Sequence, residues 1–141
     1  MSKKRTWFVS IGVVATLAMV VSMVVMSGQV VTGDYANATT AEVRDAQGQV
    51  VLRGEFLPVQ EEDDDVERKA ALKPAGADGD AAGEAEVEYP ITNPAAQEVE
   101  FAIERVEPGA TYTFVIDGKE VGSAKANGDG EAELEVKVRK S

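Results

Sequence analysis

The 141-residue chain contains neither cysteine nor histidine. Without cysteine it has no disulfide, no thiol nucleophile and no thiolate metal ligand, so a domain outside the cytoplasm depends on its core alone. The absence of histidine excludes a Ser-His-Asp triad, the usual zinc and copper sites, and the side chain that titrates near neutrality. The only serines after the apolar N-terminal run are Ser27, Ser123 and Ser141. We therefore expect no enzyme and no cofactor.

Basic residues are also scarce, with 14 Lys and Arg against 25 Asp and Glu and a net charge of −11. Three of them, Lys3, Lys4 and Arg5, precede the apolar run, so residues 34–141 carry 11 basic and 25 acidic side chains, a net charge of −14. Such a surface repels nucleic acid and anionic lipid. We expect no nucleic-acid partner.

The one long apolar run extends from Trp7 to Met26. As a helix its 20 residues reach about 30 Å, which is the thickness of the bilayer hydrocarbon. Basic residues precede the run and the first later charge is Asp34, an asymmetry that predicts a cytoplasmic N-terminus and an extracytoplasmic remainder. Residues 1–33 are predicted to form a signal anchor with a juxtamembrane linker, which begins at Ser27 and runs on to Ala38.

A cleaved signal peptide is the alternative, and the mature protein would then be secreted. Its apolar core is usually about 7 to 15 residues long and ends near a small-x-small site. The run here is longer, and the candidate sites at 31–33 and 36–38 match that pattern poorly in sequence or in distance from Met26.

Residues 34–141 show the alternation and turn signals of β-structure. Residues 40–44 and 49–56 flank Asp45-Ala46-Gln47-Gly48, which predicts a hairpin. In residues 84–89 three glutamates alternate with Ala85, Val87 and Tyr89, which predicts a strand with the glutamates in water. Four further strands and their turns complete a predicted C-terminal meander, with strands at 98–105, 111–116, 119–126 and 131–138 and turns at 106–110, 117–118 and 127–130. Phe114 is expected in the core and Val115 in solvent.

Residues 57–83 interrupt this pattern with acids, alanines and glycines. The segment includes the unbroken acidic run 61–65 and ends in Pro74-Ala-Gly-Ala-Asp-Gly-Asp-Ala-Ala-Gly83, which has little to bury. Its length and composition predict a disordered acidic loop.

Three stretches carry a resemblance: Val106 to Tyr112, Val115 to Gly122, and Gly128 to Leu134. They resemble a run found in uncharacterised secreted or membrane-anchored bacterial β-sandwich proteins. With the hairpin at 41–56, the layout is also similar to superoxide-dismutase-like and CHRD-type sandwiches. The dismutase metal ligands are histidines, which this chain lacks, so the resemblance implies a fold and no metal activity.

Calcium is the metal that these oxygen-bearing side chains suit. Asp78 and Asp80 occupy the first and third positions of an EF-hand-like loop, but Ala82 and Tyr89 stand where ligands belong. Asp129 and Glu131 form a second weak candidate inside a predicted turn.

Taken together, the sequence predicts an antiparallel β-sandwich of six or seven strands in residues 34–141, behind one N-terminal membrane or signal helix. The expected function is a non-catalytic module of a bacterial cell envelope that binds or assembles with an envelope protein. A calcium-binding or small-ligand-binding β domain is the alternative.

Overall fold

The computed structural model describes residues 25–76 and 79–139, and this part of the chain is all-β, as predicted. It contains no helix that is long and apolar enough to cross a membrane. The strands are β1 (Val25–Thr32), β2 (Thr40–Arg44), β3 (Val50–Glu55), β4 (Gln60–Glu62), β5 (Asp65–Pro74), β6 (Ala82–Pro90), β7 (Gln97–Glu104), β8 (Thr111–Ile116), β9 (Lys119–Lys125) and β10 (Ala132–Arg139).

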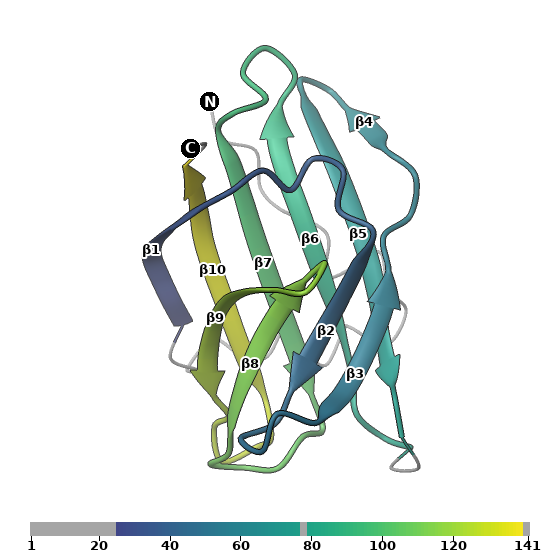
Figure 1. Ribbon diagram of the computed structural model, residues 1–141, viewed down its shortest axis with the longest axis vertical. Coiled ribbons are helices and arrows are strands. Elements are labelled where there is room, and N and C mark those ends of the chain that lie inside the picture. Colours follow the sequence, from purple (N-terminus) through teal and green to yellow (C-terminus); the bar gives the residue numbers. More distant parts are fainter. Residues whose placement is uncertain (1–24, 77–78, 140–141) are drawn as a thin grey trace.

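The strands form one mixed sheet that folds over on itself, in the order β1-β10-β7-β6-β5-β3-β2-β8-β9, with β4 paired to β5 (Figure 1). β5 joins the two halves, since it pairs with β6 along most of its length and with β3 only at Lys73 and Pro74. At the other side β9 contacts β10 and β1, so the sheet is nearly closed. The prediction of six or seven antiparallel strands was wrong in number, and β1 runs parallel to β10.

The core lies between the two halves. Phe101 on β7 and Phe114 on β8 meet there with ring centroids 4.8 Å apart and planes at 39°. Both rings are fully buried, which confirms the prediction for Phe114. Val115 is also buried, at 2% exposed, so its predicted solvent position was wrong. It lies opposite Glu42 of β2, on the face of the strand away from Phe114.

The C-terminal strands form as predicted, but most of their predicted pairings were wrong. β7 pairs with β6 and β10, whereas β8 pairs with β2 and β9. The loop 105–110 therefore carries the chain from one half of the sheet to the other. Only the β8–β9 hairpin survives from the expected meander, because turn signals fix where strands end and not which strands pair.

The hairpin of β2 and β3 is confirmed. Gly48 adopts a positive φ of 82° in its turn, a conformation that glycine takes without steric cost. Gly54 is required for a different reason, because a Cβ there would lie 2.1 Å from the carbonyl oxygen of Ala71 on β5. This close approach lets β3 pass beside β5.

The predicted disorder of residues 57–83 was wrong, since β4 and β5 occupy much of this segment. Val66, Ala70 and Leu72 are buried and supply the apolar face of β5. The guanidinium of Arg68 donates to the carbonyl oxygens of Ala36, Ala38 and Leu57 at 2.7 to 3.0 Å. β5 consists largely of small and charged residues and is ordered by its pairing with neighbouring strands. Composition alone does not reveal that pairing.

The predicted linker at 27–38 was wrong as well, because this segment belongs to the domain. β1 pairs with β10, and the Gly33 N–H donates to the Arg139 carbonyl at 3.1 Å. Tyr35 is buried, and its N–H donates to Oε1 of Gln97 at 2.8 Å. The predicted anchor helix lies outside the described residues, except for its last two positions, which begin β1.

Candidate acidic binding face

Seven glutamates lie close together on the outer face of β6, β7 and β10, and Glu104 of β7 continues this face. Ladder pairing places them in three rows across the strands: Glu84, Ala102 and Glu133; Glu86, Glu100 and Glu135; Glu88, Glu98 and Lys137. We call this surface the glutamate face, consisting of Glu84, Glu86, Glu88, Glu98, Glu100, Glu133 and Glu135. The middle row brings three carboxylates side by side on successive strands.

Several of these carboxylates are less exposed than the alternating pattern predicts. Glu84 and Glu86 are each 1% exposed and Glu100 is 7% exposed, so the prediction that the β6 glutamates point into water was wrong. β6 lies between β5 and β7 rather than at an edge. Its side chains are therefore flanked by neighbours on both sides.

Basic residues border the glutamate face. In the row of Glu88 and Glu98, the Nζ of Lys137 lies 3.3 Å from Oε2 of Glu98. On the β5 side, Lys69 stands opposite Glu86 and its Nζ lies 3.5 Å from Oε1 of Glu67. These cations leave the face with a clear excess of acidic groups.

Two glutamates on this side have raised pKa values, mainly because they are partly buried. Burial, reinforced by the charges of Glu135 and Glu131, raises the pKa of Glu133 from 4.5 to about 7. Burial also raises the pKa of Glu131, with the charges of Asp129 and Glu104 acting in the same direction, against the hydrogen bond to Asn127. Glu131 and Glu133 therefore hold protons more tightly than isolated glutamates.

Three carboxylates of the glutamate face approach one another most closely. Oxygens of Glu98, Glu100 and Glu135 lie within 4.8 Å of one another, a spacing at which a cation could bridge them. Hard cations such as Ca²⁺ prefer carboxylate and carbonyl oxygens, and usually about six to eight of them. The triad is thus a partial ligand set.

The calcium candidates from the sequence lie elsewhere. Asp129 and Glu131 belong to the β9–β10 loop, where their N–H groups donate to Oδ1 of Asn127 at 2.9 and 3.0 Å. Asp80 is exposed, and its carbonyl accepts a 2.7 Å hydrogen bond from Nε of Arg105. Asp78 lies outside the described residues. Sequence reasoning missed Glu98, Glu100 and Glu135, because they come together only when β7 pairs with β10.

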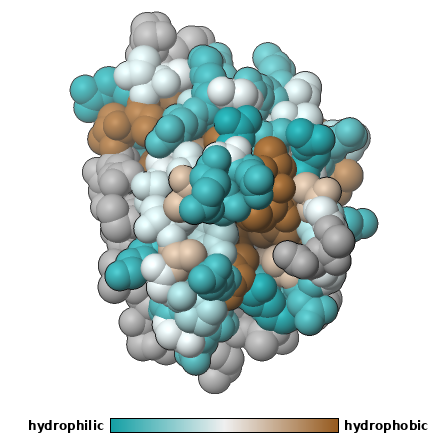
Figure 2. Space-filling view, turned by 60° about the horizontal axis from the view of Figure 1, so that its bottom comes forward, coloured by the Kyte–Doolittle hydropathy of each residue, from teal (hydrophilic) through white to brown (hydrophobic). Residues whose placement is uncertain are grey.

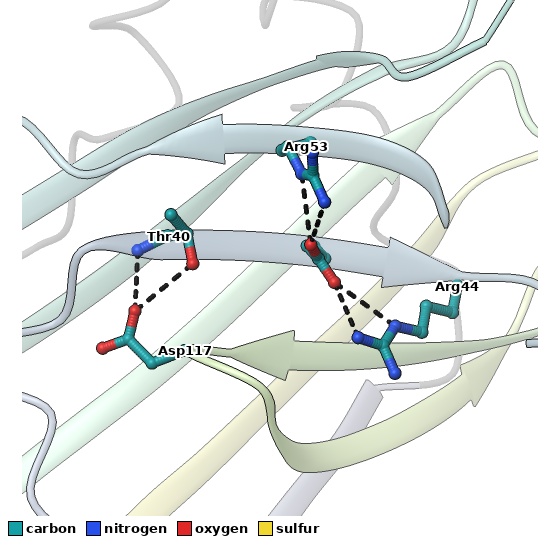
Figure 3. Close-up of polar contacts among 5 residues, drawn as sticks. Thr40, Arg44, Arg53 and Asp117 are labelled. Atoms are coloured by element: carbon teal, nitrogen blue, oxygen red, sulfur yellow. Dashed lines mark hydrogen bonds and ion pairs between the residues drawn. The ribbon is translucent and has the colours of Figure 1, made fainter. Parts of the chain in front are cut away.

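In the other half of the sheet, one carboxylate is held by two arginines (Figure 3). Glu42 on β2 receives hydrogen bonds from Arg44 and Arg53, the shortest at 2.8 and 2.5 Å. These two hydrogen bonds lower the pKa of Glu42. The carboxylate of β2 is therefore neutralised locally by two guanidinium groups.

Asp117 closes the β8–β9 turn in the same half. Burial would raise its pKa, but hydrogen bonds from Thr39 and Thr40 outweigh burial and lower it. The Thr39 hydroxyl donates at 2.7 Å and the Thr40 N–H at 2.8 Å, both to Oδ1. This carboxylate fixes the crossover between β1 and β2 and has a structural role.

Comparisons of the chain with protein-family models, with curated proteins and with solved structures find no match.

Proposed function

We propose that the chain is a non-catalytic module of a bacterial cell envelope. Residues 7–24 hold it at the membrane, and the glutamate face binds a cationic protein partner. The observation that carries the proposal is the alignment of seven carboxylates in three rows on one side of the sheet, four of which are partly exposed, namely Glu88, Glu98, Glu133 and Glu135.

The energetic cost of this alignment favours a binding role. Like charges directly opposite each other on neighbouring strands destabilise a sheet. A partner that brings positive charge would be attracted to this face, and the negative field would also accelerate its approach.

The residue inventory supports a non-catalytic role. Without cysteine and histidine, only carboxylates remain as common acid-base groups. Glycosidic chemistry needs two of them held on either side of the scissile bond. The glutamates here lie on one face of the sheet, a layout better suited to an extended partner.

Calcium binding is the second candidate, because the oxygens of Glu98, Glu100 and Glu135 lie close enough to share one ion.

The sandwich layout resembling the superoxide-dismutase-like and CHRD-type proteins remains a proposal about the fold and adds no activity.

Calorimetry on the full chain in detergent separates the two candidates. The probes are CaCl₂ and a synthetic lysine-rich peptide, at an ionic strength of about 0.15 M so that long-range attraction is screened. The test variant is E98Q/E100Q/E135Q. The control, E55Q/E107Q/E120Q, changes the charge equally at three exposed glutamates away from the face.

We expect the peptide to bind the wild type and the control equally, and the face variant several-fold more weakly. An equal loss in both variants would attribute binding to net charge and overturn the role of the face. Saturable heat from CaCl₂ that only the face variant loses would instead establish the calcium site.

A further inference from the structure

β1 begins inside the apolar run. Its first residues, Val25 and Met26, pair with Glu133 and Leu134 of β10. The 18 preceding residues from Trp7 to Val24 would span about 27 Å as a helix, and about 17 to 25 residues suffice to cross a bilayer. On the proposed tether, a membrane span over residues 7–24 would lead into β1 with no linker between them.

The ladder identifies the end of the domain that this continuity places at the membrane. Val25 lies opposite Glu133, two residues after the 126–131 loop. The 105–110 loop and the β2–β3 turn at 45–48 lie at the same end, at the bottom of Figure 1. We call this end the loop end, consisting of 45–48, 105–110 and 126–131.

The opposite end is defined by the other termini of the same strands. It includes the β6–β7 loop at 91–96 and the β8–β9 turn at 117–118. The eight residues of β10 separate the two ends by about 26 Å at the usual rise of a strand.

We infer that the loop end lies against the headgroup surface of the bilayer and that the 91–96 end points away from it. This inference rests on the proposed membrane tether. Even if residues 25–28 separated from β10, they would extend only about 13 Å, which is half the length of the domain. The domain could not then turn its far end to the membrane.

The surface of the loop end suits headgroups better than hydrocarbon. Figure 2, in which the bottom of the molecule is turned forward, shows mostly hydrophilic and intermediate residues, with one hydrophobic patch near the centre of the view and another at the upper left. Asp45, Glu107 and Asp129 are acidic members of this end. We expect contact with zwitterionic lipid, maintained by the tether, and a weaker approach to anionic lipid.

The absence of cysteine allows a direct test by site-specific labelling. Gly128→Cys and Ala46→Cys mark the loop end and Ala95→Cys marks the far end, all at exposed turn positions. A Cβ at Gly128 would meet no atom within 4 Å. Each full-length variant is labelled with bimane, reconstituted in zwitterionic vesicles and exposed to lipids with a nitroxide on the headgroup.

Fluorescence at positions 46 and 128 should be quenched several-fold more than at position 95. Inserting a Gly/Ser linker as long as the domain between Val24 and Val25 should abolish this difference. Equal quenching in the uninserted chain, with the protein floating with the vesicles, would overturn the orientation and leave the tether intact. Failure to float would overturn both the tether and the orientation.

Discussion

Glu133 offers the sharpest test of the electrostatics of the glutamate face. Its pKa is raised from 4.5 to about 7, chiefly by burial and then by Glu135 and Glu131. Between these two pH values the folded protein holds a proton that the unfolded chain has released. The associated stability is therefore complete below pH 4.5 and is lost as the pH rises through about 7.

The magnitude follows from the shift. Each unit of pKa corresponds to about 1.4 kcal/mol. Because Glu133 is only partly buried, solvent screening reduces the effect, and we expect about 1 to 2 kcal/mol in total. Glu133→Gln removes the ionisation, so it should stabilise the fold by this amount at pH 8 and leave it nearly unchanged at pH 4.5.

The difference in unfolding free energy between Glu133→Gln and wild type is measured by urea unfolding of the full chain in detergent. Far-UV circular dichroism follows the unfolding at pH values from 4.5 to 8. Glu120→Gln, at an exposed position on β9, is the matched control for the loss of one charge. If Glu133→Gln and wild type keep parallel pH profiles, or if Glu120→Gln produces the same change, the crowding of charge around Glu133 has been misread.

Three further predictions concern the fold and use urea midpoints of the same preparation. Phe114→Ala should cost about 3 to 5 kcal/mol through loss of a core ring, and Val115→Thr about 1 to 3 kcal/mol because it buries a hydroxyl; a neutral Val115→Thr would contradict the burial. Gly54→Ala should cost about 1 to 3 kcal/mol through its clash with β5, whereas Gly128→Ala, with open space around it, should change little. Replacing residues 61–83 by a short Gly/Ser linker should abolish cooperative unfolding, and retention of a sharp transition would show that β5 is dispensable.

Local signals in the sequence predicted many of the strands and turns, although β1, β4 and β5 were missed. Asp45 to Gly48 and Asp117-Gly118 specify tight turns through residues that tolerate positive φ, and both turns are present. The alternation around Phe114 likewise identified a core-facing side. Each of these features depends on a few adjacent residues.

Pairing between distant strands could not be read in the same way. Nothing in residues 105–110 indicates that the chain crosses to the other half of the sheet. β5 is rich in charge, yet its pairing with β6 and the hydrogen bonds of Arg68 order it. The glutamate triad depends on the register of β7 against β10, which only the folded chain reveals.

Cysteine accessibility tests the proposal that the domain lies outside the cytoplasm on a membrane tether. Ala95→Cys and Ser2→Cys are expressed separately as the full chain, and intact spheroplasts are treated with a membrane-impermeant maleimide. Position 95 should react in intact spheroplasts, whereas position 2 should react only after lysis. Protection of position 95, or reaction of position 2 before lysis, would contradict it.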